Sequence, residues 1–185
     1  MTEDTLLMLA LAVIAVVAAV AIWMYTSRRR HTHLREKFGS EYDRAVGTSG
    51  STAVAEKSLL EREKRVSKYK LRALTADERA RFTGLWEKVQ ARFVDDPSIA
   101  VSEGDLLVTD LMTTRGYPMA DVNRRDEDLT VDHGHVVGHY RAARDIAGRH
   151  RAAAATTEDL RQALVHYRAL FTDLLDDTHH HGDRV

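Results

Sequence analysis

The segment LLMLALAVIAVVAAVAIW, from Leu6 to Trp23, decides the architecture of this chain because it is a run of 18 apolar residues. A helix of that length, rising ~1.5 Å per residue, spans roughly 27 Å, close to the ~30 Å hydrocarbon core of a bilayer. The charge-free stretch extends from Thr5 to Ser27. Residues 1–27 are therefore predicted to form a transmembrane anchor.

The alternative interpretation of this segment is a cleaved signal peptide. Such a peptide has a basic amino-terminal region, a shorter apolar core and a cleavage site flanked by small residues. Here Glu3 and Asp4 precede the apolar run, and no convincing site of that kind follows it. The comparison favours an uncleaved helix. The residues expected in the membrane or at its interface are Leu6, Ile14, Trp23, Tyr25, Arg28, Arg29 and Arg30.

Charge predicts the orientation of the anchor. Two acids and no lysine or arginine precede the span, whereas five basic residues lie between Arg28 and Lys37. Basic residues are retained on the cytoplasmic side, and a short acidic tail is readily translocated. We therefore expect the amino terminus outside and the main domain in the cytoplasm of a single-pass cell-membrane protein. The absence of cysteine agrees with a reducing compartment.

Composition indicates an all-α protein and disfavours nucleic-acid binding. The net charge of −1 includes Glu3 and Asp4, so residues 28–185 carry only about +1, without the basic excess of nucleic-acid binders. Prolines number two and aromatic residues only 6%, while good helix formers are abundant. Residues 28–185 are long enough for one compact domain and a stalk.

Residues 28–70 are predicted to form a basic juxtamembrane collar and a charged helical stalk. We expect a short helical turn at 41–46, a flexible break from Gly47 to Thr52, and an exposed helix over 53–70. The apolar residues of that helix, Leu59, Leu60 and Val66, form only a narrow stripe.

Residues 71–177 are predicted to form a bundle of about four helices. Thr75 and Asp96 are expected caps of the first two, with Pro97 at a first helical position and Gly116 after the second helix. A third helix is expected from Asp132 to about His150, after a less regular segment at 117–131 with a short helix near 120–125. Thr156 to Asp159 is the expected start of the fourth, and 178–185 is expected to be a disordered tail. The predicted core faces of the first and last helices are Phe82, Leu85, Trp86, Val89, Phe93, Leu160, Leu164, Tyr167, Phe171 and Leu174.

Several segments resemble a family of uncharacterised bacterial, mainly actinobacterial, membrane-anchored helical proteins, many of them labelled hypothetical or secreted. These segments are Leu34–Gly39, Glu41–Asp43, Val89–Pro97, Arg115–Pro118, Val131–His133 and Thr157–Arg161. The chain departs from the family pattern at Gly134, where that pattern has proline, and at Gly138 and His139. The resemblance covers most of the chain after the anchor and implies no activity, cofactor or catalytic residue.

One histidine cluster could carry chemistry. His135 and His139 are spaced i,i+4, so both rings could face one ion, with Asp132 or His133 as a third ligand. The competing interpretation is three surface histidines at the start of a helix, which we favour because no further ligand group stands at metal-site spacing. No phosphate-binding glycine loop or nucleophile elbow occurs either. We therefore expect no catalytic, metal or cofactor-binding residue.

The expected function is a single-pass, membrane-tethered helical interaction or scaffold module without catalytic activity of its own. Its partners would be the lipid bilayer and another protein, with a homo-oligomer left open and no nucleic acid. The candidate partner surface is Arg92, Tyr117 and Pro118, although a structural ion pair is the favoured use of Arg92 and Trp86 fits the core better than a groove rim. The alternative is a metal-dependent or enzymatic helical domain using His133–His139.

Overall fold

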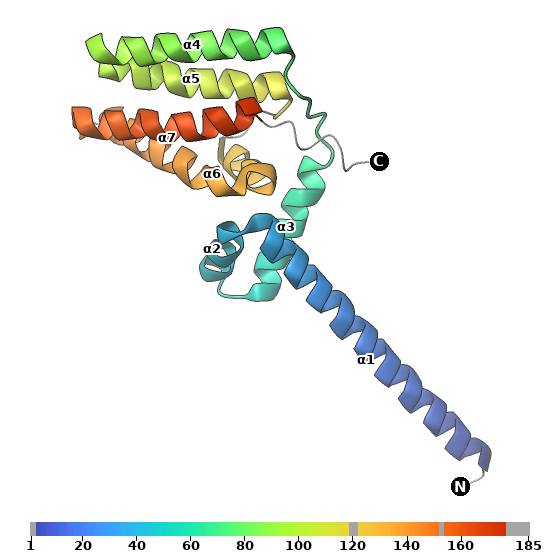
Figure 1. The fold of residues 1–185 in the computed structure, drawn as a ribbon. Helices are drawn as coiled ribbons and strands as arrows, with labels where there is room; N and C mark the ends of the chain where they lie inside the picture. The colour runs from blue at the N-terminus through green and yellow to red at the C-terminus, as the bar shows by residue number, and fades with distance from the viewer. Residues whose placement is uncertain (1–2, 119–121, 152–153, 177–185) are drawn as a thin grey trace. The chain divides into compact units, whose positions relative to one another are not determined.

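Helices make up nearly all of this chain, as the computed structural model shows for the residues it describes, 3–118, 122–151 and 154–176 (Figure 1). No strand occurs in those ranges. The helices are α1 (Glu3–Phe38), α2 (Ser40–Ser49), α3 (Thr52–Val66), α4 (Ala76–Asp95), α5 (Pro97–Arg115), α6 (Val122–Arg151) and α7 (Thr157–Asp176). The predicted all-α class is confirmed, with four helices after residue 71. The predicted tail at 178–185 lies outside the described residues.

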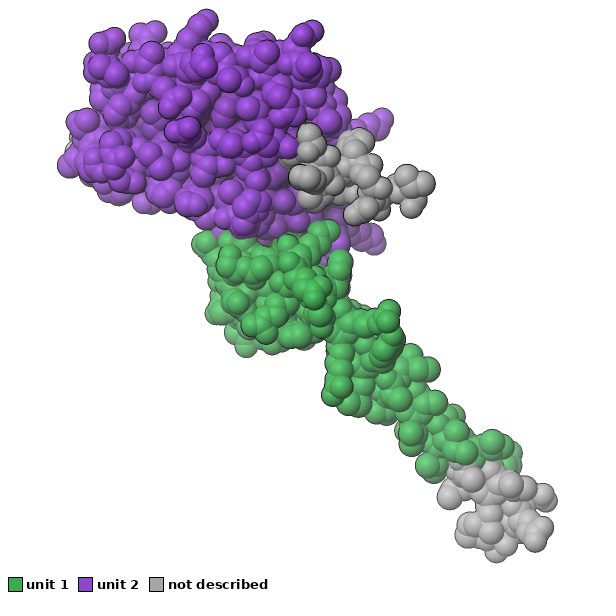
Figure 2. Space-filling model, in the orientation of Figure 1, with its two compact units in different colours: residues 1–59 green, residues 60–185 purple. Residues whose placement is uncertain are grey.

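The chain divides into two compact units, residues 1–59 and residues 60–185 (Figure 2). The division falls within α3, earlier than the domain start expected near Leu71.

The first unit contains α1, which is long and apolar enough to cross a bilayer. Its large apolar side chains are exposed, which is what a helix surrounded by lipid requires. They are Met8, Leu11, Val13, Ile14, Val16, Val17, Val20, Ile22, Trp23, Met24 and Tyr25. The side chain of Leu6, another predicted anchor residue, lies outside the described residues. The candidate span is thus confirmed, while its orientation stays a prediction.

A polar cluster of His31, Tyr42 and Glu56 joins the end of α1 to α2 and α3. His31 of α1 lies 2.9 Å from Glu56 of α3, and the Tyr42 hydroxyl of α2 donates to Glu56 across 3.0 Å. Burial, reinforced by the Glu56 carboxylate, raises the pKa of Tyr42 to about 12. The flexible break expected from Gly47 was wrong for residues 47–49, which belong to α2; only residues 50 and 51 separate α2 from α3.

The helix expected over 53–70 ends at Val66, and one of its faces is buried rather than exposed. Leu59 and Val66 are fully buried. In the second unit, Arg65 Nε donates to the buried Asp128 carboxylate across 2.7 Å, and the Tyr69 hydroxyl donates to the same carboxylate across 2.6 Å. These bonds fix the end of α3 and the segment after it to α6.

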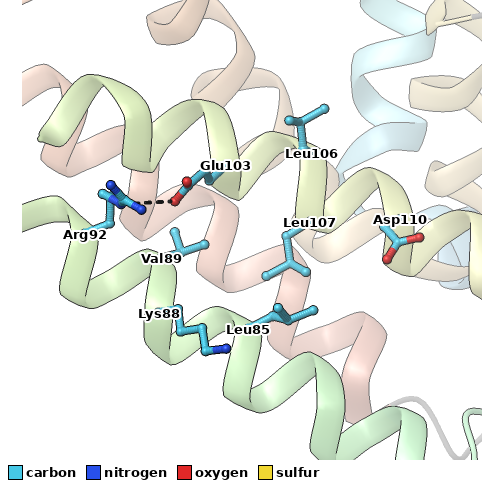
Figure 3. A pocket seen from close by; sticks show the side chains of 8 residues that line it. All are labelled: Leu85, Lys88, Val89, Arg92, Glu103, Leu106, Leu107 and Asp110. Carbon is cyan, nitrogen blue, oxygen red and sulfur yellow. Dashed lines mark ion pairs between the residues drawn. The ribbon is translucent and has the colours of Figure 1, made fainter.

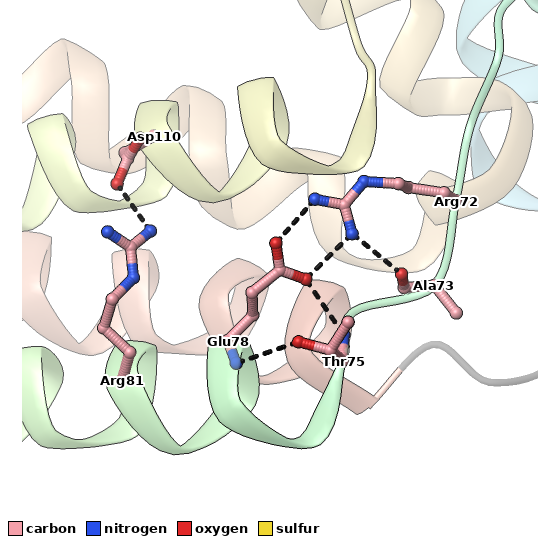
Figure 4. Close-up of polar contacts among 6 residues, drawn as sticks. All are labelled: Arg72, Ala73, Thr75, Glu78, Arg81 and Asp110. Atoms are coloured by element: carbon pink, nitrogen blue, oxygen red, sulfur yellow. Dashed lines mark hydrogen bonds and ion pairs between the residues drawn. The ribbon is translucent and has the colours of Figure 1, made fainter.

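The predicted N-cap Thr75 is confirmed, and the structure shows it as part of a capping box at the start of α4 (Figure 4). The Glu78 backbone amide donates to Thr75 Oγ1, and the Glu78 carboxylate accepts from the Thr75 amide across 2.9 Å. Arg72 donates to both carboxylate oxygens of Glu78, which together with the Thr75 bonds lowers the pKa of Glu78 to about 2. The box therefore stays ionised and closed at any physiological pH.

Both predicted ends of α5 are confirmed. Asp96 accepts from the Ile99 amide across 3.0 Å, and Pro97 occupies the first helical position. At the other end Gly116 has a φ of 97°, and a Cβ there would lie 2.5 Å from the Lys70 carbonyl oxygen. Only glycine satisfies both the left-handed backbone and this close approach.

The third predicted helix starts in the wrong place. α6 begins at Val122 rather than at Asp132, so Asp132 lies inside it. The backbone leaves helical geometry at His133, with φ −124° and ψ 30°, which is one residue beyond the predicted cap. A helix start was expected at this place, and the structure has a kink there between two helical stretches of α6. Residues 120 and 121, part of the expected short helix, lie outside the described residues.

The core of the second unit is organised by α7. This helix packs against α5 and α6, and Phe171 stacks on Trp86 of α4 with 4.7 Å between ring centroids (Figure 1). The predicted face of α7 is confirmed, since Leu160, Tyr167, Phe171 and Leu174 are buried. Its start is a second capping box, in which Asp159 accepts from the Thr156 amide across 2.8 Å.

Replacing Phe171 with alanine is expected to lower the free energy of unfolding by about 3–5 kcal/mol, because a buried ring and its stacking contact with Trp86 are lost. Phe93 is only partly buried against this core, so Phe93→Ala should cost less. The matched control is Val165→Ala on the exposed face of the same helix. Denaturant unfolding of the detergent-solubilised chain, followed by tryptophan fluorescence, measures each value. A loss below about 1 kcal/mol for Phe171→Ala would contradict the assigned core.

Candidate functional site

A groove of about 400 Å³ runs between α4 and α5 on the outside of the second unit (Figure 3). It is lined by four residues of each helix: Leu85, Lys88, Val89 and Arg92 from α4, and Glu103, Leu106, Leu107 and Asp110 from α5. The residues of each helix follow spacings of three, four and seven, which place them on one helix face. The two faces meet because α4 and α5 pack side by side.

The groove has an apolar floor. Val89 and Leu107 are buried beneath it, and Leu85 is half-buried. Leu106 stands at its edge with 67% of its surface exposed, next to the buried Leu107 and Val108. A large exposed apolar side chain beside an apolar depression is a feature of binding surfaces.

The two rims of the groove carry opposite charges. Lys88 and Arg92 lie on the α4 rim, and Glu103 and Asp110 on the α5 rim (Figure 3). Arg92 Nε lies 3.9 Å from the Glu103 carboxylate. Asp110 likewise lies 3.4 Å from the guanidinium of Arg81, one turn before Leu85 (Figure 4). These pairs are about half exposed and contribute little stability, so their charges remain available to a partner.

The groove offers an apolar contact area with charged side chains on both rims. Its eight lining residues include no histidine, cysteine, serine, threonine or tyrosine. An apolar floor between charged rims is the surface that accepts the apolar face of an amphipathic helix.

The predicted partner residues do not form one surface. Arg92 lines the groove, and Pro118 is exposed. Tyr117 is buried, with 4% of its surface exposed, and its hydroxyl lies 3.0 Å from His133 Nε2. Tyr117 is therefore part of the interior. Trp86 occupies the core, as favoured from its position on the apolar stripe.

His133 is also buried, so the expectation of a surface histidine was wrong for this residue. Its Nδ1 donates to Asp173 of α7, and its Nε2 faces the Tyr117 hydroxyl. Both ring nitrogens thus have a polar partner. The ring links the kink in α6 to α7 and to the segment after α5.

The other two histidines of the predicted cluster face different partners. His135 Nε2 lies 2.8 Å from Asp173, and His139 Nδ1 lies 2.9 Å from His166 Nδ1. Burial, together with the neighbouring His139, lowers the pKa of His166. No group of three or more metal-ligating side chains occurs in the described part of the chain. The three histidines therefore do not converge on one point there.

The residues predicted to lie at the membrane interface, from Trp23 to Arg30, follow the apolar part of α1. Trp23 and Tyr25 are exposed, and the Arg29 guanidinium stacks on the Tyr25 ring, 4.6 Å from its centroid. Arg28 and Arg30 are exposed beside it. An aromatic and basic band at the end of an apolar span is typical of a membrane interface.

Sequence reasoning missed most of the groove and the partner of His133. Glu103 and Asp110 share a helix face through their seven-residue spacing, which is a readable signal, but the pattern does not show which helix lies beside them. Asp173 stands on the polar side of a clear apolar stripe, where an acid needs no explanation. Only the packing of α6 on α7 brings it to His133.

No protein-family model, curated protein or solved structure matches this chain. The resemblance to actinobacterial membrane-anchored proteins stays a prediction.

The contact of Asp173 with two histidines makes its stabilisation pH-dependent. Burial alone would raise the pKa of Asp173, but its hydrogen bonds to His133 and His135 and their charges outweigh it, so the pKa is lowered. A lowered pKa stabilises the fold above the ordinary aspartate value of about 3.9, and this stabilisation is lost as the pH falls through the lower folded value.

Asp173→Asn is expected to lower the free energy of unfolding by about 2 kcal/mol at neutral pH, the range for hydrogen bonds to a charged group. The difference from the unsubstituted chain should shrink as the pH falls below about 3.9. Urea unfolding at a series of pH values measures it, with the exposed Asp145→Asn on α6 as control. A difference that is independent of pH would show that Asp173 acts without its charge.

Proposed function

We propose that this chain is a single-pass, membrane-tethered interaction module that uses the α4/α5 groove to bind an amphipathic helix of a membrane-associated partner protein. The observation that carries the proposal is the exposed Leu106 above an apolar floor, between a basic and an acidic rim.

The groove specifies the kind of helix that would fit. The α4 rim runs from Leu85 to Arg92, which are seven positions apart, or roughly 10 Å, about two helical turns. A partner helix would therefore insert apolar side chains at positions i, i+3 or i+4, and i+7. Acidic residues on its edge toward α4 and basic residues on its edge toward α5 would complement Lys88, Arg92, Glu103 and Asp110.

A contact of two helical turns buries little surface and therefore gives low affinity. Anchoring in a membrane offsets this low affinity. Confining a module and its partner to one membrane raises their effective concentration, so a weak contact becomes sufficiently populated. The Arg28–Arg30 cluster adds attraction to anionic lipids of about 1 kcal/mol per residue near the headgroups. A membrane location thus suits a binding site of this size.

The proposed orientation places the second unit in the cytoplasm, with the amino terminus outside. Single-cysteine variants test it, because the chain has no native cysteine. In intact cells a membrane-impermeant maleimide is expected to label Thr2→Cys and to leave Ser51→Cys unlabelled until the cells are permeabilised. The reverse pattern would overturn the orientation and leave the groove proposal standing.

A photo-crosslinking amino acid at Leu106 tests the groove in native membranes. We expect one discrete adduct at Leu106 and none at Val165, which is exposed on α7 but lies outside the groove. Reversing the α4 rim with Lys88→Glu and Arg92→Glu together should reduce the adduct several-fold, because the partner's acidic edge would then be repelled.

The adduct also identifies the kind of occupant. An adduct with the mass of two copies of this chain would replace the partner protein with a homo-oligomer. An adduct that survives the charge reversal unchanged, or equal labelling at Leu106 and Val165, would refute the groove as a specific site.

A further inference from the structure

The opposite side of α5 borders a second, polar pocket of about 220 Å³, enclosed between α5, α6 and α7. Three arginines, one carboxylate and two tyrosine hydroxyls meet there: Arg125, Arg144, Arg151, Asp105, Tyr140 and Tyr167. Neither the groove nor the membrane anchor uses any of these residues.

The pocket carries an excess of positive charge. Three guanidinium groups face one carboxylate among its lining residues. Arg144 also pairs with Asp126 at its edge, across 3.0 Å, and its guanidinium lies over the Tyr140 ring. Positive charges in a partly enclosed, low-dielectric space attract an anion more strongly than the same charges on an open surface.

Tyr167 gives the second, independent observation. Its side chain is fully buried, and its hydroxyl lies beside the Asp105 carboxylate without making a hydrogen bond at bonding geometry in the described part of the chain. A buried hydroxyl that lacks a well-formed hydrogen bond is unfavourable, so such groups normally face water or a ligand. This hydroxyl lines the pocket.

Both tyrosines are suited to donate to an anion. Burial raises the pKa of Tyr140, and burial together with the nearby Asp105 carboxylate raises that of Tyr167. Both hydroxyls therefore stay protonated at neutral pH. Arg125 lies 3.4 Å from the Tyr140 hydroxyl, so charge and hydroxyl donors occupy one side of the pocket.

Asp105 narrows the class of ligand. A carboxylate repels a plain anion but accepts a hydrogen bond from a hydroxyl group. We propose that this pocket binds a small phosphate monoester that also carries a hydroxyl group, with the phosphate on the arginines and Tyr167 and the hydroxyl on Asp105. The same chemistry occurs in a free polyol phosphate and in a phospholipid headgroup.

Calorimetric titration of the full chain in phosphatidylcholine nanodiscs with glycerol 3-phosphate tests this proposal. We expect saturable binding of one molecule per chain, and much weaker binding of sulfate, which has the charge but no hydroxyl group. Arg144→Gln should weaken binding at least about tenfold, as expected for losing a charged hydrogen bond.

Two control variants separate ligand binding from folding. Asp126→Asn breaks the same ion pair as Arg144→Gln but keeps the arginine, so affinity should be maintained or rise. Tyr167→Phe removes only the hydroxyl that lines the pocket, so affinity should fall about tenfold while the melting temperature is unchanged or higher.

The source of the phosphate follows from a second set of nanodiscs that contain phosphatidylinositol 4-phosphate, whose headgroup carries both a phosphate monoester and free hydroxyl groups. Weaker glycerol 3-phosphate binding in these nanodiscs would identify a lipid headgroup as the competing ligand, and unchanged binding a free metabolite. No saturable binding at millimolar concentration would overturn the proposal. So would equal affinity for sulfate, which would indicate an adventitious ion only, or an affinity that Arg144→Gln and Tyr167→Phe leave unchanged.

Discussion

The second unit depends on α7, because this helix contacts each of the three other bundle helices. Its apolar face lies against α5 and α6, and Phe171 stacks on Trp86 of α4. Burying an aromatic pair in this way contributes both apolar area and a favourable ring geometry. The end of α5 is also bonded to the end of α7, since the buried Arg115 donates to the Leu174 carbonyl oxygen across 2.6 Å. The groove and the polar pocket keep their shapes because α5 is packed against this helix.

Polar groups inside the unit fall into two kinds. The His133 ring has partners at both nitrogens, so it specifies how α6, α7 and the end of α5 meet. The Tyr167 hydroxyl has no partner at bonding geometry among the described residues, although it is equally buried. A satisfied polar network favours one packing, whereas an unsatisfied hydroxyl in a cavity weakens the fold unless a ligand binds there. This difference distinguishes a structural histidine cluster from a candidate ligand site.

Membrane tethering would offset the low affinity expected of a groove this short. An exposed apolar helix such as α1 is unfavourable in water and favourable in lipid, which makes it a candidate membrane span. The groove is two turns long and half-polar, a size that gives modest affinity in solution. Tethering reduces the entropy that such a contact must overcome, so both features fit one proposed role in partner recruitment at a membrane.

The sequence by itself determined the local features of this protein. The apolar run of α1, the Thr75 and Thr156 capping boxes, the ends of α5 and the buried face of α7 all follow from interactions within a few residues, which periodicity and cap chemistry report. The tertiary structure alone decided that His133 and Tyr117 are buried, that Leu106 is exposed, and that Asp105, Arg144 and Tyr167 share a pocket. Each of these depends on which helix lies beside which, and residues 16 to 62 positions apart in the chain carry no local pattern that reveals their contact.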